Sequence, residues 1–314
     1  MPKIIVLGGL GFVGSHVARA LSNEYEVTVL DSLTEDLYPK DQKIRSAEML
    51  NSGKNAIDVR IAPMESMSVS ELSEFSGVVN LAALPGLSNS WHQSNRLWDS
   101  NVSSFHTLLN RISELKKKPF IVHASTSSVY GKIATANEGT VPNPVSPYGI
   151  SKLAAEQTLK LYGEKEALNY TILRLFSVYG PGQRPEMAYA KGIQCALTGT
   201  VFQKFGSGEQ SRSNTYVEDV ADAFALSVKA LQDEVVLPSV LNIGGLERVS
   251  LNEALATIEQ LTGKELLTRS NKAIAGDQLQ TEADISLAKK TLGWSPKVRI
   301  LEGLRRQIEW QKSL

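Results

Sequence analysis

The fold is decided by Lys3-Ile-Ile-Val-Leu7-Gly8-Gly-Leu-Gly-Phe-Val-Gly14, close to the start of the chain. Its first five residues form a continuous apolar run, which is typical of a strand buried on both faces of a parallel sheet. The glycine-rich segment follows, and residues 15–21 have a helical pattern, so we predict a strand, a tight turn and a helix. In that setting the glycines allow close approach of the backbone to a pyrophosphate, whose charge the helix N-terminus attracts.

The second predicted strand supports a dinucleotide as the ligand of this turn. It spans Glu26–Leu30 and ends at Asp31, where a carboxylate fits the hydroxyls of an adenosine ribose. The same carboxylate repels a 2′-phosphate, and Ser32 and Leu33 supply no cation that would bind one. We therefore predict NAD rather than NADP. The alternative is an ordinary glycine turn followed by an Asp that caps a loop, and the spacing makes this less favourable.

Apolar runs and helical patterns alternate along the first three quarters of the chain. Further strands are predicted at Ile57–Ala62, Val78–Ala83, Pro119–Ala124, Tyr170–Leu175 and Val240–Ile243, and helices near Arg45–Leu50, Asp99–Leu115, Tyr148–Glu164, Val217–Leu231 and Leu301–Trp310. This alternation predicts an α/β fold with a doubly wound parallel sheet. Loops rich in Gly, Pro and Arg follow Ser177. We therefore expect a nucleotide-binding domain over residues 1–175, to which the chain returns at about 216–245, and a smaller, mainly substrate-binding lobe over residues 176–314.

Two side chains on one predicted helix form a candidate acid/base pair. Ser146 and Pro147 mark a helix start, so Tyr148 and Lys152 are separated by one turn and share a face. A free Tyr has a pKa of about 10, and a nearby positive charge favours the phenolate. Tyr and Lys are common residues, so the pair taken by itself could equally be part of an exposed helix face. Four hydroxyl residues, 125–128, follow a predicted strand, at the sheet edge where ligands bind in parallel sheets.

Composition excludes several classes of function. The chain has 314 residues, a formal net charge of zero and 42% hydrophobic residues, which gives no indication of a nucleic-acid or anionic-membrane partner. Cys195 is the only cysteine and there are four His, so we expect no disulfide framework, no metal site and a buried role for Cys195. No apolar run approaches the ~18 residues of a membrane span. With no signal-peptide features at the start, we expect no membrane association and a cytoplasmic location.

Together the motifs resemble a known family, the extended short-chain dehydrogenases/reductases that act on sugar nucleotides and have a Rossmann fold. The resemblance covers the chain nearly end to end. It includes Gly8–Gly14, Asp31, Leu81-Ala-Ala83, Ser90, Asn101, Ser125–Gly131, Tyr148 with Lys152, Arg174–Gly182, Arg212, Tyr216-Val-Glu-Asp219, Asn242-Ile-Gly244, Gly276-Asp277, Asp284 and Leu292-Gly-Trp-Ser-Pro296. It implies that the chain is an isomerase, an NAD-dependent 4-epimerase that acts on a UDP-sugar. It also implies a homodimer formed through the helices near 99–115 and 148–164.

The resemblance also assigns roles to residues. It implies that Tyr148 takes the proton from the C4 hydroxyl while hydride passes to the nicotinamide, that Lys152 lowers the pKa of Tyr148, and that Thr126 hydrogen bonds the same oxygen. The cofactor-binding residues are expected to be Gly8, Gly11, Phe12, Val13, Gly14, Asp31, Ser32, Leu81, Ala82, Ala83 and Asn101, with Tyr148 and Lys152. The substrate-binding residues are expected to be Pro85, Ser90, Thr126, Ser127, Ser128, Ser177, Arg184, Arg212 and Asp277.

Two departures within the family narrow the substrate. Ser127 and Ser128 stand where 4,6-dehydratases carry an acid pair, and UDP-glucuronate decarboxylases carry Glu at the position of Ser128. Ser177 and the segment Arg184-Pro-Glu-Met-Ala188 are similar to UDP-glucuronate 4-epimerases. The resemblance therefore favours conversion of UDP-glucuronate to UDP-galacturonate. The alternatives are a UDP-glucose or UDP-N-acetylglucosamine 4-epimerase, a UDP-glucuronate decarboxylase, and an NAD-binding regulator without turnover.

Overall fold

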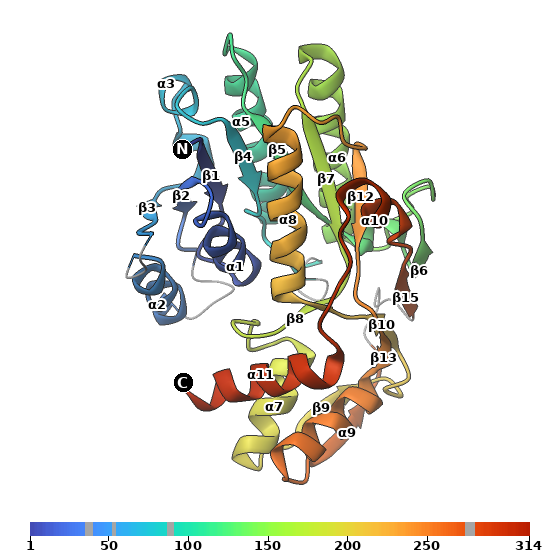
Figure 1. Ribbon diagram of the computed structural model, residues 1–314. Coiled ribbons are helices and arrows are strands. Elements are labelled where there is room, and N and C mark those ends of the chain that lie inside the picture. Colours follow the sequence, from blue (N-terminus) through green and yellow to red (C-terminus); the bar gives the residue numbers. More distant parts are fainter. Residues whose placement is uncertain (35–39, 52–54, 87–90, 274–279) are drawn as a thin grey trace.

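A computed structural model describes residues 1–34, 40–51, 55–86, 91–273 and 280–314. Its centre is a seven-stranded sheet of order β12-β7-β5-β4-β1-β2-β3, in which every neighbouring pair is parallel (Figure 1). The strands are β1 Lys3–Leu7, β2 Glu26–Asp31, β3 Asp58–Ile61, β4 Gly77–Asn80, β5 Phe120–Thr126, β7 Tyr170–Leu175 and β12 Val240–Ile243. The predicted doubly wound α/β fold is confirmed, and all seven predicted strands are present.

The continuous apolar runs exist because helices cover both faces of this sheet. Successive strand residues point to opposite faces, so Ile4 and Val6 join one buried cluster while Ile5 and Leu7 join the other. The first cluster packs under α1 (Phe12–Leu21), α8 (Val217–Gln232) and α10 (Ser286–Leu292), and the second under α5 (Ser104–Ser113) and α6 (Pro147–Glu166). Both faces of the sheet are therefore closed to solvent, and a ligand can reach it only at the ends of its strands.

A second region lies below the sheet in the view of Figure 1. It contains α7 Ala188–Thr198, α9 Leu251–Thr262 and α11 Ile300–Lys312, which pack around a separate apolar core. Cys195 is buried in this core, as expected from the sequence. The remaining strands are short. β13 Arg248–Ser250, β10 Ser211–Ser213, β15 Gln280–Ala283 and β6 Ile133–Ala136 form one sheet, and two pairs are formed by β11 Thr215–Tyr216 with β8 Val178–Tyr179 and by β14 Thr268–Asn271 with β9 Phe202–Phe205.

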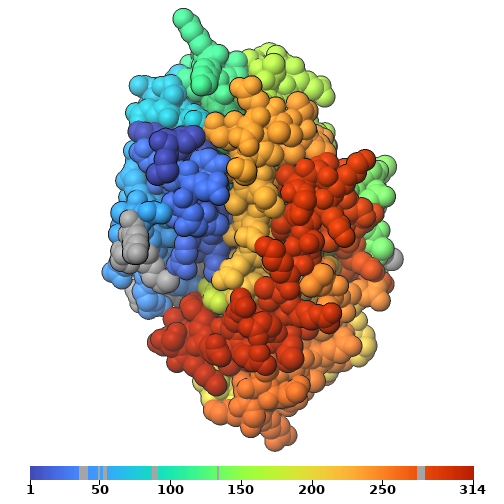
Figure 2. Space-filling model, in the orientation of Figure 1, coloured from blue at the N-terminus to red at the C-terminus, as the bar shows by residue number. Residues whose placement is uncertain are grey.

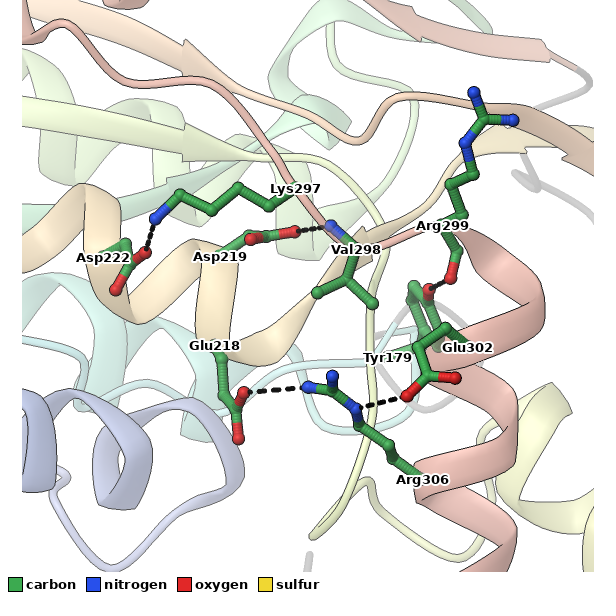
Figure 3. A network of polar contacts seen from close by, with 9 residues as sticks. All are labelled: Tyr179, Glu218, Asp219, Asp222, Lys297, Val298, Arg299, Glu302 and Arg306. Atoms are coloured by element: carbon green, nitrogen blue, oxygen red, sulfur yellow. Dashed lines mark hydrogen bonds and ion pairs between the residues drawn. The ribbon is translucent and has the colours of Figure 1, made fainter.

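Polar contacts join the C-terminal segment to α8, which belongs to the large sheet (Figure 3). Lys297 pairs with Asp222 at 2.7 Å, and the Val298 N–H donates to Asp219 at 3.0 Å. Arg306 on α11 lies 3.4 Å from Glu218. The two ion pairs, Lys297–Asp222 and Arg306–Glu218, are exposed, and such pairs contribute about 0–1 kcal/mol each to stability. They therefore orient the C-terminal segment more than they stabilise the fold. Figure 2 shows this C-terminal segment spread over the junction of the two regions.

The predicted helix near 99–115 has a different form from the one expected. It begins as α4 (Ser94–Trp98), passes through a π-helical turn (Asp99–Ser103) and continues as α5. Such turns are frequent at functional sites, and this one contains Asn101, a predicted site residue. In the described part of the chain, no helix has the length and apolarity that crossing a membrane requires.

Candidate active site

A cleft of about 1190 Å³ opens at the carboxyl ends of the parallel strands. Nineteen of the predicted site residues line it: Gly8, Gly11, Phe12, Val13, Gly14, Asp31, Ser32, Leu81, Ala82, Ala83, Pro85, Thr126, Ser127, Ser128, Tyr148, Lys152, Ser177, Arg184 and Arg212. Asn101 does not line the cleft, and Ser90 and Asp277 lie outside the described residues. Residues predicted from segments up to 204 positions apart are thus brought to one site.

The glycine turn has the shape that a dinucleotide requires. Gly8 has φ +74°, and a Cβ there would lie 2.8 Å from the Ala82 backbone. A Cβ on Gly14 would lie 2.2 Å from the Gly8 carbonyl oxygen. Any side chain at either position would push the strand, the turn and the helix apart. Because α1 begins directly after Gly11, its first N–H groups face the cleft edge, and these residues fit the phosphates of NAD.

Asp31 is held at the same end of the cleft by three donors. Its carboxylate accepts from the Leu10 N–H at 3.1 Å, the Leu33 N–H at 2.9 Å and the Lys43 ammonium at 2.8 Å. Lys43 comes from α2 (Lys40–Asn51) and, like Asp31, is buried. Sequence reasoning missed this cation because only the fold brings a residue twelve positions downstream back to the strand end.

Local sequence explains how the acid/base pair is placed. The Ser146 hydroxyl accepts from the Gly149 N–H at 3.1 Å, and Pro147 occupies the first turn, so α6 begins there. This start brings Tyr148 and Lys152 to the cleft one turn apart. Thr126 ends β5 opposite them, where its hydroxyl accepts from the Ser128 N–H at 3.1 Å and hydrogen bonds Tyr148.

Burial dominates the electrostatics of the pair. It raises the pKa of Tyr148, while Arg184 and the hydrogen bond from Thr126 act in the opposite direction. Burial also lowers the pKa of Lys152 to about 8, against the field of Glu156. Arg184 is therefore a cation that favours the Tyr148 phenolate in this structure, and it is paired with Glu186 at 2.9 Å. That Lys152 lowers the pKa of Tyr148 stays a prediction.

The loop that carries Arg184 is attached to the glycine-turn side of the cleft. The carbonyl of Pro181 accepts from His16 Nε2 on α1 at 2.9 Å, and the carbonyl of Gly182 accepts from the Gln42 side chain on α2 at 3.2 Å. Carbonyl oxygens only accept, so His16 carries its proton on Nε2. These bonds hold the predicted sugar-binding loop against the predicted cofactor-binding turn.

Asn101 supports the wall of the cleft from behind. Its side chain accepts from the Leu84 N–H at 2.7 Å and donates to the Leu84 carbonyl at 3.1 Å and to the Ser151 hydroxyl at 3.1 Å. It therefore fixes Leu84, which lines the cleft, against α6. Its predicted contact with the cofactor stays a prediction.

Several lining residues were not predicted as site residues, and some of them are in loops. Lys43, Pro63, Met64, Leu84 and Met187 all face the cleft. Pro63 and Met64 follow β3 and give that wall an apolar surface suited to a base. Pro63, Leu84 and Met187 are loop residues, which carry no periodic signal that would place them. Within the described ranges, no group of three or more His, Cys, Asp or Glu side chains is arranged to hold a metal.

Comparisons with known proteins agree with this geometry. The model of the NAD dependent epimerase/dehydratase family matches residues 4–244. The chain is 33% identical to the uncharacterised UDP-glucose epimerase YtcB of Bacillus subtilis, covering 99% of this chain and 98% of that protein. It is 31% identical to the UDP-glucuronate 4-epimerase of Thermodesulfobacterium geofontis, over 99% and 97%. The UDP-glucuronic acid 4-epimerase of Bacillus cereus, solved with UDP-glucuronic acid and NAD, superposes with a TM-score of 0.94 at 31% identity, over 99% of both chains.

Proposed function

The chain belongs to the NAD dependent epimerase/dehydratase family, and we propose that it is an NAD-dependent UDP-glucuronate 4-epimerase. It would interconvert UDP-glucuronate and UDP-galacturonate. The observation that carries the proposal is a single cleft that contains the glycine turn, the Thr126–Tyr148–Lys152 set and a group of serines with Arg184. The relatives that act on UDP-glucuronate support the same substrate.

Each of the chain's own residues has a defined task in this proposal. Tyr148 takes the proton from the sugar C4 hydroxyl and later returns it, and Thr126 hydrogen bonds the same oxygen. Lys152 favours the phenolate and binds the nicotinamide ribose. When bound, NAD supplies a reversible acceptor for the hydrogen on C4. Inversion follows if the 4-keto sugar turns over in the cleft before the hydrogen returns, so there is no net redox change.

The serines and Arg184 would hold the sugar carboxylate. Ser127 and Ser128 are buried at the end of β5, Ser177 lines the opposite wall, and Arg184 lies near Tyr148. A 4-keto uronate is a β-keto acid that loses CO₂ easily. Hydrogen bonds that keep the carboxylate charged and out of line with the ketone suppress that loss, and the hydroxyl of Ser128 supplies no acid that would assist it.

We also propose that two copies of the chain associate through α5 and α6. Ile150 and Leu161 on α6 are exposed by 48% and 66%, which leaves apolar surface uncovered on this helix. Sedimentation of the protein with its cofactor bound measures the association directly.

Two further expectations, a cytoplasmic location and the division of the chain at residue 175, stay predictions from the sequence.

The decisive experiment is incubation of the purified protein with UDP-glucuronate and no added NAD. A product of equal mass that co-elutes with UDP-galacturonate is expected, since the cofactor should remain bound through purification. A product lighter by CO₂ would contradict the role given to Ser128. No product, with NAD released on denaturation, would retain the cofactor assignment and reject this sugar.

The Asp31–Lys43 pair gives a prediction about cofactor choice. Replacing Asp31 by Asn removes a carboxylate that repels a 2′-phosphate and leaves the Lys43 ammonium to attract one. We expect the preference for NAD over NADP to fall by about two orders of magnitude, because juxtaposed like charges cost several kcal/mol. The measurement is the ratio of the two cofactors retained when protein from which the bound cofactor has been removed is incubated with equal amounts of both.

The matched control for cofactor choice is the double variant Asp31→Asn with Lys43→Met. It lacks both the repelling carboxylate and the attracting cation, so it should retain less NADP than Asp31→Asn alone. Equal NADP retention by the two variants would exclude Lys43 as the attracting group.

A further inference from the structure

Three buried polar side chains form a line behind the acid/base pair. Lys152, His123 and Asn80 are each no more than 3% exposed. Lys152 Nζ lies 3.5 Å from His123 Nε2, and Asn80 Nδ2 lies 3.2 Å from His123 Nδ1. The imidazole is stacked on the ring of Phe105 with centroids 4.6 Å apart and an interplanar angle of 12°. His123 and Asn80 have no task in the proposed reaction.

The backbone fixes the orientation of Asn80 and therefore the tautomer of His123. The Ala82 N–H donates to Asn80 Oδ1 at 3.1 Å, and because a backbone N–H only donates, the amide oxygen must face it. The amide nitrogen then faces His123 Nδ1 and donates to it. Nδ1 accepts, so it carries no proton. A neutral imidazole has one N–H, which is therefore on Nε2 and points towards Lys152.

We propose that Asn80 and His123 are positioning residues for Lys152, and that they hold an imidazole N–H donor against its amine. This inference rests on the proposed function. An ammonium group has no acceptor to offer this N–H, so its own hydrogens are directed away from His123, towards the cleft that Lys152 lines. The neutral amine can accept this N–H and the ammonium cannot, so the contact lowers the pKa of Lys152. Below that pKa Lys152 is still the ammonium, the form that favours the Tyr148 phenolate in the proposed reaction.

The charges around the line are consistent with this role. Burial and the field of Lys152 hold the pKa of His123 well below its usual value, so the imidazole stays neutral. On α6, Glu156 acts to raise the pKa of Lys152, and Tyr148 lies one turn before it. Glu156 is itself paired with Arg174 on β7 through two bonds of 2.6 and 2.9 Å, which offsets much of its charge. Burial lowers the pKa of Lys152 to about 8.

The tautomer can be measured on the unaltered protein with its cofactor bound. Nitrogen NMR of the histidine-labelled chain distinguishes the two N–H positions, and variants at His16, His92 and His106 assign His123 among the four histidines. We expect the Nε2–H form of a neutral ring from pH 6 to 9. The Nδ1–H form, or a charged ring at neutral pH, would overturn the inference. No substrate is needed, so this result is independent of whether UDP-glucuronate is turned over.

The coupling to Lys152 is tested by Asn80→Asp. One carboxylate oxygen still accepts from the Ala82 N–H, while the other accepts from His123 and draws the proton to Nδ1, so that Nε2 becomes an acceptor for the Lys152 ammonium. We expect the titration midpoint of Lys152, followed by the ¹³Cε shift of labelled lysine, to rise by about one pH unit. The alkaline limb of the pH–rate profile should move with it.

The double variant Asn80→Asp with His123→Phe separates the tautomer from the added charge. It contains the carboxylate but no imidazole, so a smaller rise of the Lys152 midpoint than in Asn80→Asp is expected. An equal rise in both variants, or a changed tautomer with an unchanged midpoint, would show that His123 does not act on Lys152. If Asn80→Asp does not fold, the tautomer of the unaltered protein still decides the proposal.

Discussion

Replacing Tyr148 by Phe should lower the rate of epimerisation by about 10²–10⁴-fold, the usual contribution of a general base. The ring keeps its volume and its place at the start of α6, so the cleft and the bound cofactor should be retained. What is lost is the hydroxyl that hydrogen bonds Thr126 and lies in the field of Arg184. Turnover of UDP-glucuronate and the NAD released on denaturation are the two measurements.

Tyr162→Phe is the matched control for this experiment. Tyr162 lies on the same helix, and its hydroxyl donates a hydrogen bond to the Asn110 side chain outside the cleft. The control removes the same atom from the same helix, and its turnover should equal that of the unaltered protein. Turnover by Tyr148→Phe within tenfold of the control would mean that another group takes the proton.

The sequence was sufficient for the parts of the molecule that depend on local patterns. The run Lys3–Leu7 predicted a strand buried on both faces, and the structure confirms it because residues 4 and 6 pack in a different cluster from residues 5 and 7. The start of α6 was equally local, since Ser146 caps it and Pro147 begins it. A pattern of this kind needs only the residues that form it.

Local sequence patterns could not predict the side chains that contact Asp31 and Lys152. Lys43 meets Asp31 only because the chain after β2 returns α2 to the end of that strand, and His123 meets Lys152 only because β5 packs against α6. In the sequence, His123 is one polar residue in an apolar strand. Its separation from Lys152 carries no periodic signal. Such pairs follow from the sheet order, which the alternation of strands and helices does not specify.

Removing one partner of the Arg174–Glu156 pair should have the largest effect on stability. The pair joins β7 to α6 beneath the cleft, with the two side chains 2% and 0% exposed. Glu156 also accepts from the Ser125 hydroxyl at 2.5 Å, and the guanidinium of Arg174 lies 4.8 Å from the centroid of the Tyr130 ring. Arg174→Met leaves a buried carboxylate without its cation. We expect the free energy of unfolding to fall by about 3–5 kcal/mol, as measured by denaturant titration.

The charge, rather than the volume, is the cause of this loss, and a second replacement tests that. Adding Glu156→Leu to Arg174→Met removes the uncompensated carboxylate, and apolar pairs of similar volume often replace buried ion pairs without loss. The double variant should therefore recover most of the stability. The cofactor content of each sample has to be equal, because a bound ligand stabilises the folded state by mass action. A double variant as unstable as Arg174→Met would instead indicate that the packing of Arg174 on Tyr130 is what stabilises this region.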